Sequence, residues 1–193
     1  MKNIILIIIT IFFLTSCEKE NKLSDKEIAQ YISKGKEIGK ATVKKLGSNL
    51  MTHMKQGGPA QAIPFCNVKA SPLTLEVAKK YNVSIKRTSH KIRNENSNPN
   101  ETETAILKNY LASLSNGEKI KPIVKKDETG KVHFYAPIKL EAKCLACHGT
   151  IGKEVTQKTD SILKSLYPND KATGFKVGDL RGMINITFNK PIN

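Results

Sequence analysis

The sequence predicts one α+β domain, in which a helical first half is followed by an antiparallel sheet with flanking helices. Apolar side chains recur at helical spacing over residues 25–54, and they alternate with polar ones, as in strands, over residues 83–88 and 131–140. The 193 residues show no internal repeat or long low-complexity segment, and this length suits a single ordinary core. We therefore expect one domain over residues 24–193.

The first half of the chain predicts helices. Ser24 and Glu27 form a capping box that marks the start of a long helix. The Gly-Gly-Pro sequence at residues 57–59 marks the end of this helix. The predicted segments are, in order, a long helix from residue 25 to this Gly-Gly-Pro sequence, a short helical or turning segment at 59–68, and a separate helix at 72–81.

The second half predicts strands alternating with shorter helices. The Asp-Glu-Thr-Gly sequence at residues 127–130 is a hairpin turn between two strands, and residues 94–100 form a loop rich in Asn, Ser and Pro. The predicted elements are, in order, a strand at 83–88, a helix from 101 or 102 to 116, strands at 120–126 and 131–140, a helix at 154–166 and a strand at 183–188.

The start of the chain predicts export and a lipid anchor. After a basic start, residues 4–14 are an apolar run, which is shorter than the about 20 residues of a transmembrane helix and suits a signal peptide. The Leu-Thr-Ser-Cys sequence at residues 14–17 resembles a bacterial lipobox and implies cleavage before Cys17 and its acylation. We expect residues 1–16 to be a signal peptide, residues 17–23 a lipidated tether, and the protein to be held to a membrane of the bacterial cell envelope, facing the periplasm or the surface.

The composition is strongly basic, with a formal net charge of +15. Such a charge permits nucleic-acid binding in principle, but the export signal argues against it. The lysines are scattered and few aromatic residues lie between them, so an ordinary solvated surface is favoured over attraction to anionic lipid or to an acidic redox partner.

The most specific motif is Cys144-Leu145-Ala146-Cys147-His148, which is typical of covalent haem attachment. The thiols of Cys144 and Cys147 would form thioether bonds to the haem, and His148 would be the proximal iron ligand. Gly149 would let the backbone turn away without a Cβ clash. Half of a zinc site and a redox-active Cys pair are weaker alternatives, because no second close Cys or His pair and no βαβ pattern is present.

One cysteine remains after the lipobox and the haem motif are assigned. An odd thiol in an oxidising envelope suggests an intermolecular partner or a ligand, and this thiol belongs to Cys66. His53 and Met54, near the end of the long helix, are further candidate ligands, although an exposed His and a core Met are the favoured interpretations of each residue taken alone.

The chain resembles the single-haem c-type proteins with a PAS-like fold that are proposed redox or gas sensors. The resemblance covers residues 60–188, and four segments carry it: residues 63–67 (IPFCN), 86–89 (KRTS) with 93–94, 144–149 (CLACHG), and 167–174 (YPNDKATG) with 178–182 (GDLRG). It implies a PAS-like sheet with one covalent haem c on one side, ligated by His148 and by a cysteine thiolate at Cys66.

Two departures from the family pattern affect the expected site. An extra residue stands before Pro72, and His90 replaces an apolar residue, so His90 is a rival to Cys66 as the distal ligand. His53, Met54 and Met183 rank lower. Arg87 and Arg93 are candidate partners for the haem propionates, because guanidinium groups bind carboxylates with two hydrogen bonds, with ordinary surface charge as the alternative.

The expected function is that of a low-potential haem protein without catalytic activity. A thiolate ligand stabilises ferric iron, and its release on reduction would open a position for a gas such as carbon monoxide or nitric oxide. A sensor of this kind would need a redox or signalling partner protein. An electron-transfer lipoprotein is the alternative function, and a peroxidase is less favoured because a Cys66 ligand would block the iron.

Overall fold

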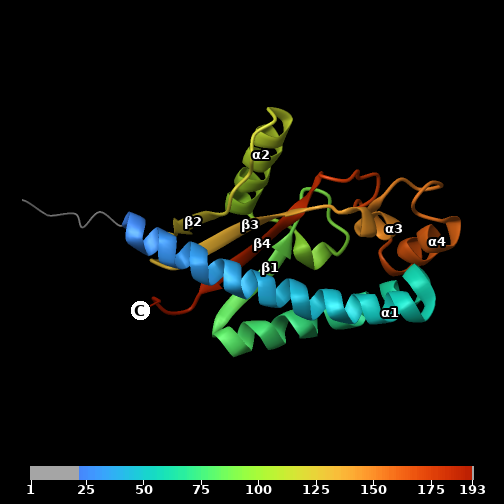
Figure 1. Ribbon diagram of the computed structural model, residues 1–193, viewed down its shortest axis with the longest axis horizontal. Helices are drawn as coiled ribbons and strands as arrows, with labels where there is room; N and C mark the ends of the chain where they lie inside the picture. The colour runs from blue at the N-terminus through green and yellow to red at the C-terminus, as the bar shows by residue number, and fades with distance from the viewer. Residues whose placement is uncertain (1–21, 193) are drawn as a thin grey trace, which may run out of the picture.

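The computed structural model describes residues 22–192 and has the predicted α+β architecture (Figure 1). Four strands form one open antiparallel sheet in the order β1-β4-β3-β2, and four α-helices surround it. The predicted signal peptide at residues 1–16, Cys17 and most of the tether lie outside the described residues. The elements are α1 (Asp25–Tyr81), β1 (Val83–Thr88), the 3-10 turn η1 (Glu95–Ser97), α2 (Glu101–Ser115), β2 (Ile123–Lys126), β3 (Val132–Lys139), the 3-10 turn η2 (Ala142–Cys144), α3 (Leu145–His148), α4 (Gln157–Leu166) and β4 (Leu180–Phe188).

Helix α1 is a helical hairpin made of two arms. Its first arm begins at the predicted capping box, where the Ser24 side chain accepts a hydrogen bond from the Glu27 amide. The chain then reverses at Gly57 and Gly58, whose backbone is not helical, and Gly58 adopts the left-handed φ of 63° that favours glycine. The second arm runs back along the first, as Figure 1 shows, and Asn82 ends it at φ 52°.

The second arm is one continuous helix, so the prediction of two separate segments at residues 59–68 and 72–81 is wrong. Pro64 and Pro72 lie inside this helix. Each proline removes a backbone hydrogen bond, and in an isolated helix this costs about 3 kcal/mol. Tertiary packing outweighs that cost, because the arm buries side chains near both of its ends: Ala62, Ile63, Thr74, Val77 and Ala78.

Strand β1 has the predicted bounds, whereas β2, α4 and β4 each begin three residues from the predicted position. Helix α4 begins at Gln157 rather than at residue 154, because the Thr156 side chain caps it by accepting a hydrogen bond from the Thr159 amide. Strand β4 begins at Leu180, three residues early, where it pairs with Lys139 beside an irregularity in the ladder.

The sheet is covered on both faces. Alternate side chains of β3 and β4 point to α1 on one face and to α2 on the other: Phe134, Ile184 and Ile186 toward α1, and Tyr135 and Met183 toward α2. Helix α1 lies so close to the sheet that a Cβ atom on Gly35 would be 2.3 Å from the Phe134 ring.

A buried carboxylate fastens α2 to the sheet. Glu103 is fully buried and accepts hydrogen bonds from Lys86 Nζ of β1 at 2.6 Å and from Asn185 Nδ2 of β4 at 2.9 Å. Its second role is to cap α2, since it also accepts from the Asn100 amide. Burial raises the pKa of Glu103, but these hydrogen bonds outweigh burial and leave the pKa below its ordinary value.

The Cys-x-x-Cys-His motif and α4 lie together at the kinked end of α1 (Figure 1). Ile63 of the second arm packs there against Val155 and Leu163, with Cys147 at the edge of the cluster. No helix among residues 22–192 is long and apolar enough to cross a membrane.

Candidate functional site

The motif occupies η2 and the single turn of α3, directly after β3. Cys144, Cys147 and His148 are all half-buried, and both thiols are free. Gly149 follows at φ −73°, and a Cβ atom there would be 2.8 Å from the Leu145 carbonyl oxygen and 2.8 Å from the Glu154 side chain. Glycine is therefore needed for close approach, as predicted, so that the chain can leave the turn beside α3.

The imidazole of His148 is held in one orientation. Its Nδ1 lies 2.7 Å from the carbonyl oxygen of Ala172, so Nδ1 carries the proton and donates it, and the lone pair is on Nε2. Burial lowers the pKa of His148 to about 3, with contributions from the charges of Arg93 and Arg181. A neutral imidazole with an oriented free nitrogen is the form that binds metals.

Arg93 links the motif to the loop that holds His148. Its Nη2 donates to the carbonyl oxygens of Cys147 at 2.6 Å and Ala172 at 3.3 Å, and its Nε donates to Asp170 Oδ2 at 3.0 Å. The Arg93 and Asp170 side chains are only 13% and 8% exposed. The sequence marked Arg93 as a propionate partner, but its contacts to the two carbonyl groups show that it also positions the His148 turn.

The loop after α4 lies alongside the motif. Asp170 Oδ1 accepts from the Ala172 amide at 2.7 Å, and the amide of Gly174 donates to the Gly149 carbonyl at 2.8 Å. The Phe175 amide donates to the His148 carbonyl at 3.0 Å. The only signal for this loop in the sequence was its part in the family resemblance.

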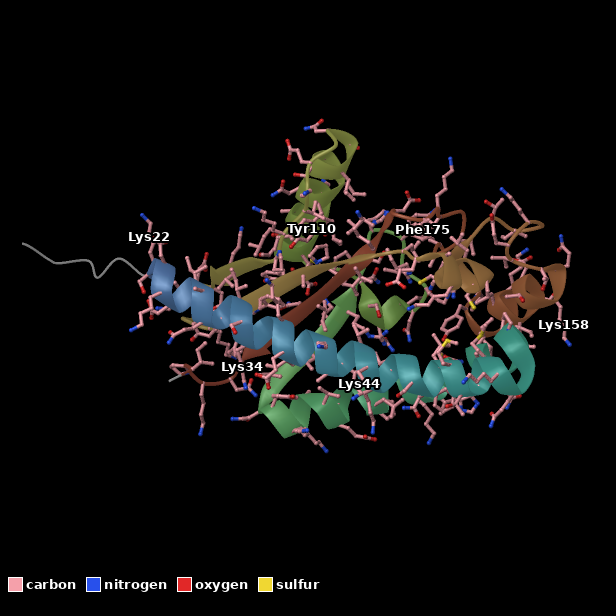
Figure 2. The ribbon with its side chains drawn as sticks, viewed as in Figure 1. Lys22, Lys34, Lys44, Tyr110, Lys158 and Phe175 are labelled. Carbon is pink, nitrogen blue, oxygen red and sulfur yellow. The ribbon has the colours of Figure 1, made fainter. Side chains whose placement is uncertain are left out.

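A buried aromatic ring lies beside two of the candidate ligands. The Phe175 ring, labelled in Figure 2, meets the rings of His148 and His90 edge-on at centroid distances of 6.3 and 6.0 Å. Lys91 Nζ and the Arg181 guanidinium lie over the same ring at 4.5 and 5.7 Å. The structure thus brings His90 close to the motif, although His90 itself is exposed.

Cys66 reaches the motif from the second arm of α1. Burial raises the pKa of its thiol, whereas the charges of Arg87 and Arg93 act in the opposite direction. Burial also raises the pKa of Cys147, and the thiols of Cys66 and Cys144 contribute to that increase, so the three sulfur atoms lie in one neighbourhood. Figure 2 shows yellow sulfur atoms gathered where α3 meets α1. The structure brings Cys66 and the motif together, as the resemblance implied.

The remaining predicted residues differ in their surroundings. Arg87 is exposed on β1, and its guanidinium forms no hydrogen bond or ion pair within residues 22–192, so it is available to an anion. His53 stacks on Phe65 at 3.8 Å, its buried Nδ1 has no hydrogen-bond partner in the described part of the chain, and Met54 is half-buried. Met183 is fully buried in the cluster beneath α2, where packing explains it.

The donors present fit a haem. Two free thiols, an oriented imidazole and a third thiol lie in one region of the structure, where Arg87, Lys91, Arg93 and Arg181 supply positive charge for two carboxylates. Within the described chain no group of three or more His, Cys, Asp or Glu side chains is arranged to hold a bare metal ion.

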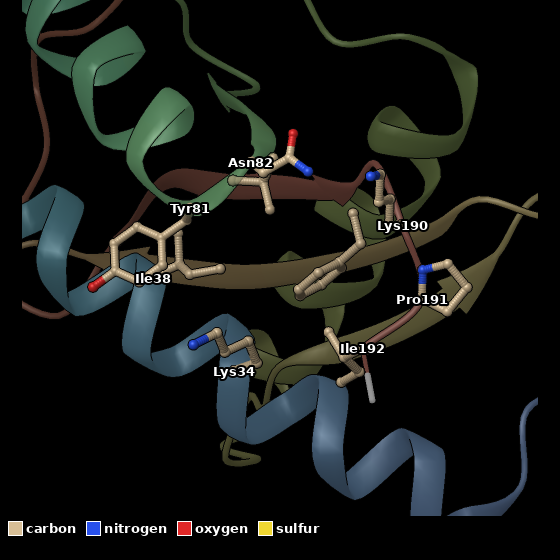
Figure 3. A pocket seen from close by; sticks show the side chains of 9 residues that line it. Lys34, Ile38, Tyr81, Asn82, Lys190, Pro191 and Ile192 are labelled. Carbon is tan, nitrogen blue, oxygen red and sulfur yellow. The ribbon is translucent and has the colours of Figure 1, made fainter.

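Two hollows elsewhere do not contain these residues. One, of about 170 Å³ (Figure 3), is lined by residues of α1, β1, β4 and the C-terminal tail and by no residue of the motif. The other, of about 330 Å³, lies between the start of α1 and β2. Neither brings together groups that would catalyse a reaction.

Comparisons with known proteins concern the family and the fold of the chain. Residues 18–189 match the family model described as Tll0287-like. The crystal structure of the cyanobacterial heme-protein Tll0287 matches with a TM-score of 0.64 and 22% identity, over 85% of this chain and 98% of that one. This likeness shows a shared fold. No curated protein matches the chain.

Proposed function

The chain belongs to the Tll0287-like family, and on this basis we propose that it is a haem protein with one haem c attached through Cys144 and Cys147. The observation that carries the proposal is the hydrogen bond from His148 Nδ1 to the Ala172 carbonyl, at 2.7 Å. This bond leaves Nε2 as the nitrogen that ligates iron, one residue after the second thiol. The fold match to a protein described as a heme-protein supports it.

The side chains around the site have distinct roles in this proposal. His148 is the proximal ligand, and Arg93 keeps its turn in place through the Cys147 and Ala172 carbonyl groups. Cys66 is the distal ligand, with His90 as the alternative. Arg87 binds a propionate, because it lies near Cys66 and has no partner among the described residues. When bound, haem supplies one-electron redox chemistry.

The ligand set favours redox or gas sensing. Cys66 contributes an anionic sulfur, which lowers the reduction potential, whereas a Met ligand would raise it. Cys66 also lies on the second arm of the α1 hairpin, where the neighbouring Phe65 stacks on His53 of the first arm. Displacement of the Cys66 side chain would therefore be transmitted to the hairpin.

We further propose that the protein is a lipoprotein of the bacterial cell envelope, anchored through Cys17, and that it acts with a redox or signalling partner protein. The supporting features are the signal sequence and lipobox in residues 1–17. The PAS-like assignment of the fold also remains a prediction. Passing electrons to an envelope partner is the alternative function, and it requires a potential matched to that partner.

The test is the absorption spectrum of the haem-loaded protein, oxidised and reduced, beside Cys66→Ala, His90→Ala and Met183→Leu. We expect a thiolate-to-iron charge-transfer band and split Soret features that vanish only in Cys66→Ala. Loss of the band in His90→Ala, or no change in any variant, contradicts Cys66 ligation and favours the electron carrier. Binding of carbon monoxide by the reduced protein supports gas sensing, and a reduced protein that stays six-coordinate contradicts it.

A further inference from the structure

The first arm of α1 carries a stripe of lysine and apolar side chains on the face opposite the sheet. At 100° per residue the six positions fall within about 120° of the helix circumference, on one side of it, and all are exposed. Val43 and Met51 are 63% and 44% exposed, which is unusual for large apolar side chains on a core-facing helix. The stripe consists of Lys36, Lys40, Val43, Lys44, Met51 and Lys55, of which Figure 2 labels Lys44.

The lysines of the stripe are not neutralised within the described protein. Among residues 22–192 none of the four forms an ion pair or a side-chain hydrogen bond, whereas nearby lysines do, as in Lys34–Glu37 at 2.8 Å and Lys45–Glu76 at 2.7 Å. Lys36, Lys40 and Lys44 are spaced four residues apart, where like charges repel and weaken a helix. An external anionic surface would relieve this repulsion.

The second arm adds exposed apolar side chains at the same positions along the hairpin axis as those of the first arm. The arms are aligned by the Lys45–Glu76 ion pair and by the stacking of His53 on Phe65. In this register Leu75, which is 53% exposed, lies level with Val43, and Val68, which is 65% exposed, lies level with Met51. Four of the six exposed large hydrophobic residues of the described chain therefore belong to this hairpin.

We propose that the outer surface of the α1 hairpin lies against an anionic lipid surface. Lysine head groups would contact the lipid phosphates while Val43, Met51 and their neighbours enter the interface, as in basic amphipathic helices. The choice of a membrane rests in part on the proposed anchor at Cys17. The tether at residues 17–23 spans at most about 25 Å, so it holds the start of α1 beside the bilayer. In this orientation helix α2, on the opposite face of the sheet (Figure 1), faces away from the membrane and is accessible to partner proteins.

The experiment is vesicle co-sedimentation of the haem-loaded chain from Glu18 onward, which lacks the acylated residue but contains every described element. Anionic vesicles contain phosphatidylglycerol and phosphatidylcholine, and neutral vesicles contain phosphatidylcholine alone. Each lysine near an anionic surface contributes about a 5-fold gain in binding, so Lys40→Glu/Lys44→Glu should lower binding to the anionic vesicles at least about 25-fold. Val43→Ser/Met51→Ser should also lower it without a change in charge.

The matched control is Lys119→Glu/Lys121→Glu, which makes the same change in net charge on the exposed segment between α2 and β2. We expect this pair to lower binding less than about 5-fold. Equal losses in the two lysine pairs would show a general charge effect and overturn the proposal, as would the absence of any preference for anionic vesicles. The haem absorption of the same samples reports the proposed function separately, since the stripe contains no haem ligand.

Discussion

Replacing Arg93 with methionine tests whether the His148 turn depends on a buried ion pair. The substitution keeps much of the aliphatic stem but removes the guanidinium that contacts Asp170 and the carbonyl groups of Cys147 and Ala172. The Asp170 carboxylate, which is 8% exposed, would then have lost its cation in a place that water scarcely reaches.

The expected cost follows from this burial. Removing one partner of a buried ion pair costs about 3–5 kcal/mol of unfolding free energy, because the remaining charge is left uncompensated. Asp170→Asn keeps the acceptor for the Ala172 amide and leaves Arg93 its two carbonyl contacts, so it should cost less, about 1–3 kcal/mol. The double variant should cost less than the sum of the single variants, since no charge is left alone.

The assay is urea denaturation of the haem-loaded protein, followed by circular dichroism and by haem absorption, which should give coincident transitions. Lys143→Met is the matched control: Lys143 lies beside the motif and pairs with Glu141 at 2.8 Å, but these side chains are 70% and 68% exposed, so less than about 1 kcal/mol is expected. If Arg93→Met costs no more than Lys143→Met, the buried ion pair does not hold the His148 turn.

Two further predictions concern the scaffold. Gly35→Ala should lower the unfolding free energy by about 1–3 kcal/mol, because the new Cβ would meet the Phe134 ring at 2.3 Å. The control Gly39→Ala should be neutral or slightly stabilising, because no atom lies within 4 Å of its new Cβ. Equal effects of the two substitutions in thermal melts would disprove close packing at Gly35. The pKa of Glu103 is lower in the folded than in the unfolded state, so its carboxylate stabilises the fold above the unfolded pKa, and this contribution disappears as the pH falls through the folded pKa. Glu103→Gln should therefore be less stable than the unmodified protein at pH 7, and its unfolding free energy should fall less as the pH is lowered. If the unfolding free energies of the two proteins fall in parallel with pH, the Glu103 carboxylate does not stabilise the fold.

Much of the fold was predictable because local signals and tertiary structure agree. The capping box at Ser24, the strand β1 and the hairpin turn at residues 127–130 all appear where the sequence placed them. The sequence wrongly predicted two separate segments in the second arm of α1 because of its prolines. Proline is unfavourable in helices by local rules, and only the burial of the surrounding apolar residues against the sheet and α4 keeps Pro64 and Pro72 in one helix.

The candidate site likewise has one part that the sequence predicts and another that only the structure shows. The motif residues are adjacent in sequence, so the sequence alone could predict a chemistry for them. The role of Arg93 could not, because its acceptors lie 54 to 79 residues away along the chain and two of them are backbone carbonyl groups, which carry no residue-specific signal. The same holds for Phe175, whose ring lies beside both His148 and His90.

The sequence by itself determined the α+β class, the position of the haem motif and the leftover thiol of Cys66, because these depend on residue type and short-range spacing. Tertiary structure alone decided which groups surround the motif. The reversal of α1 at Gly57 and Gly58 carries Cys66 back to α3, and the loop at Ala172 fixes the ring nitrogen that His148 presents. Such contacts arise from chain segments meeting in space, and a hydrogen bond to a backbone oxygen can be made by almost any sequence that follows the same path.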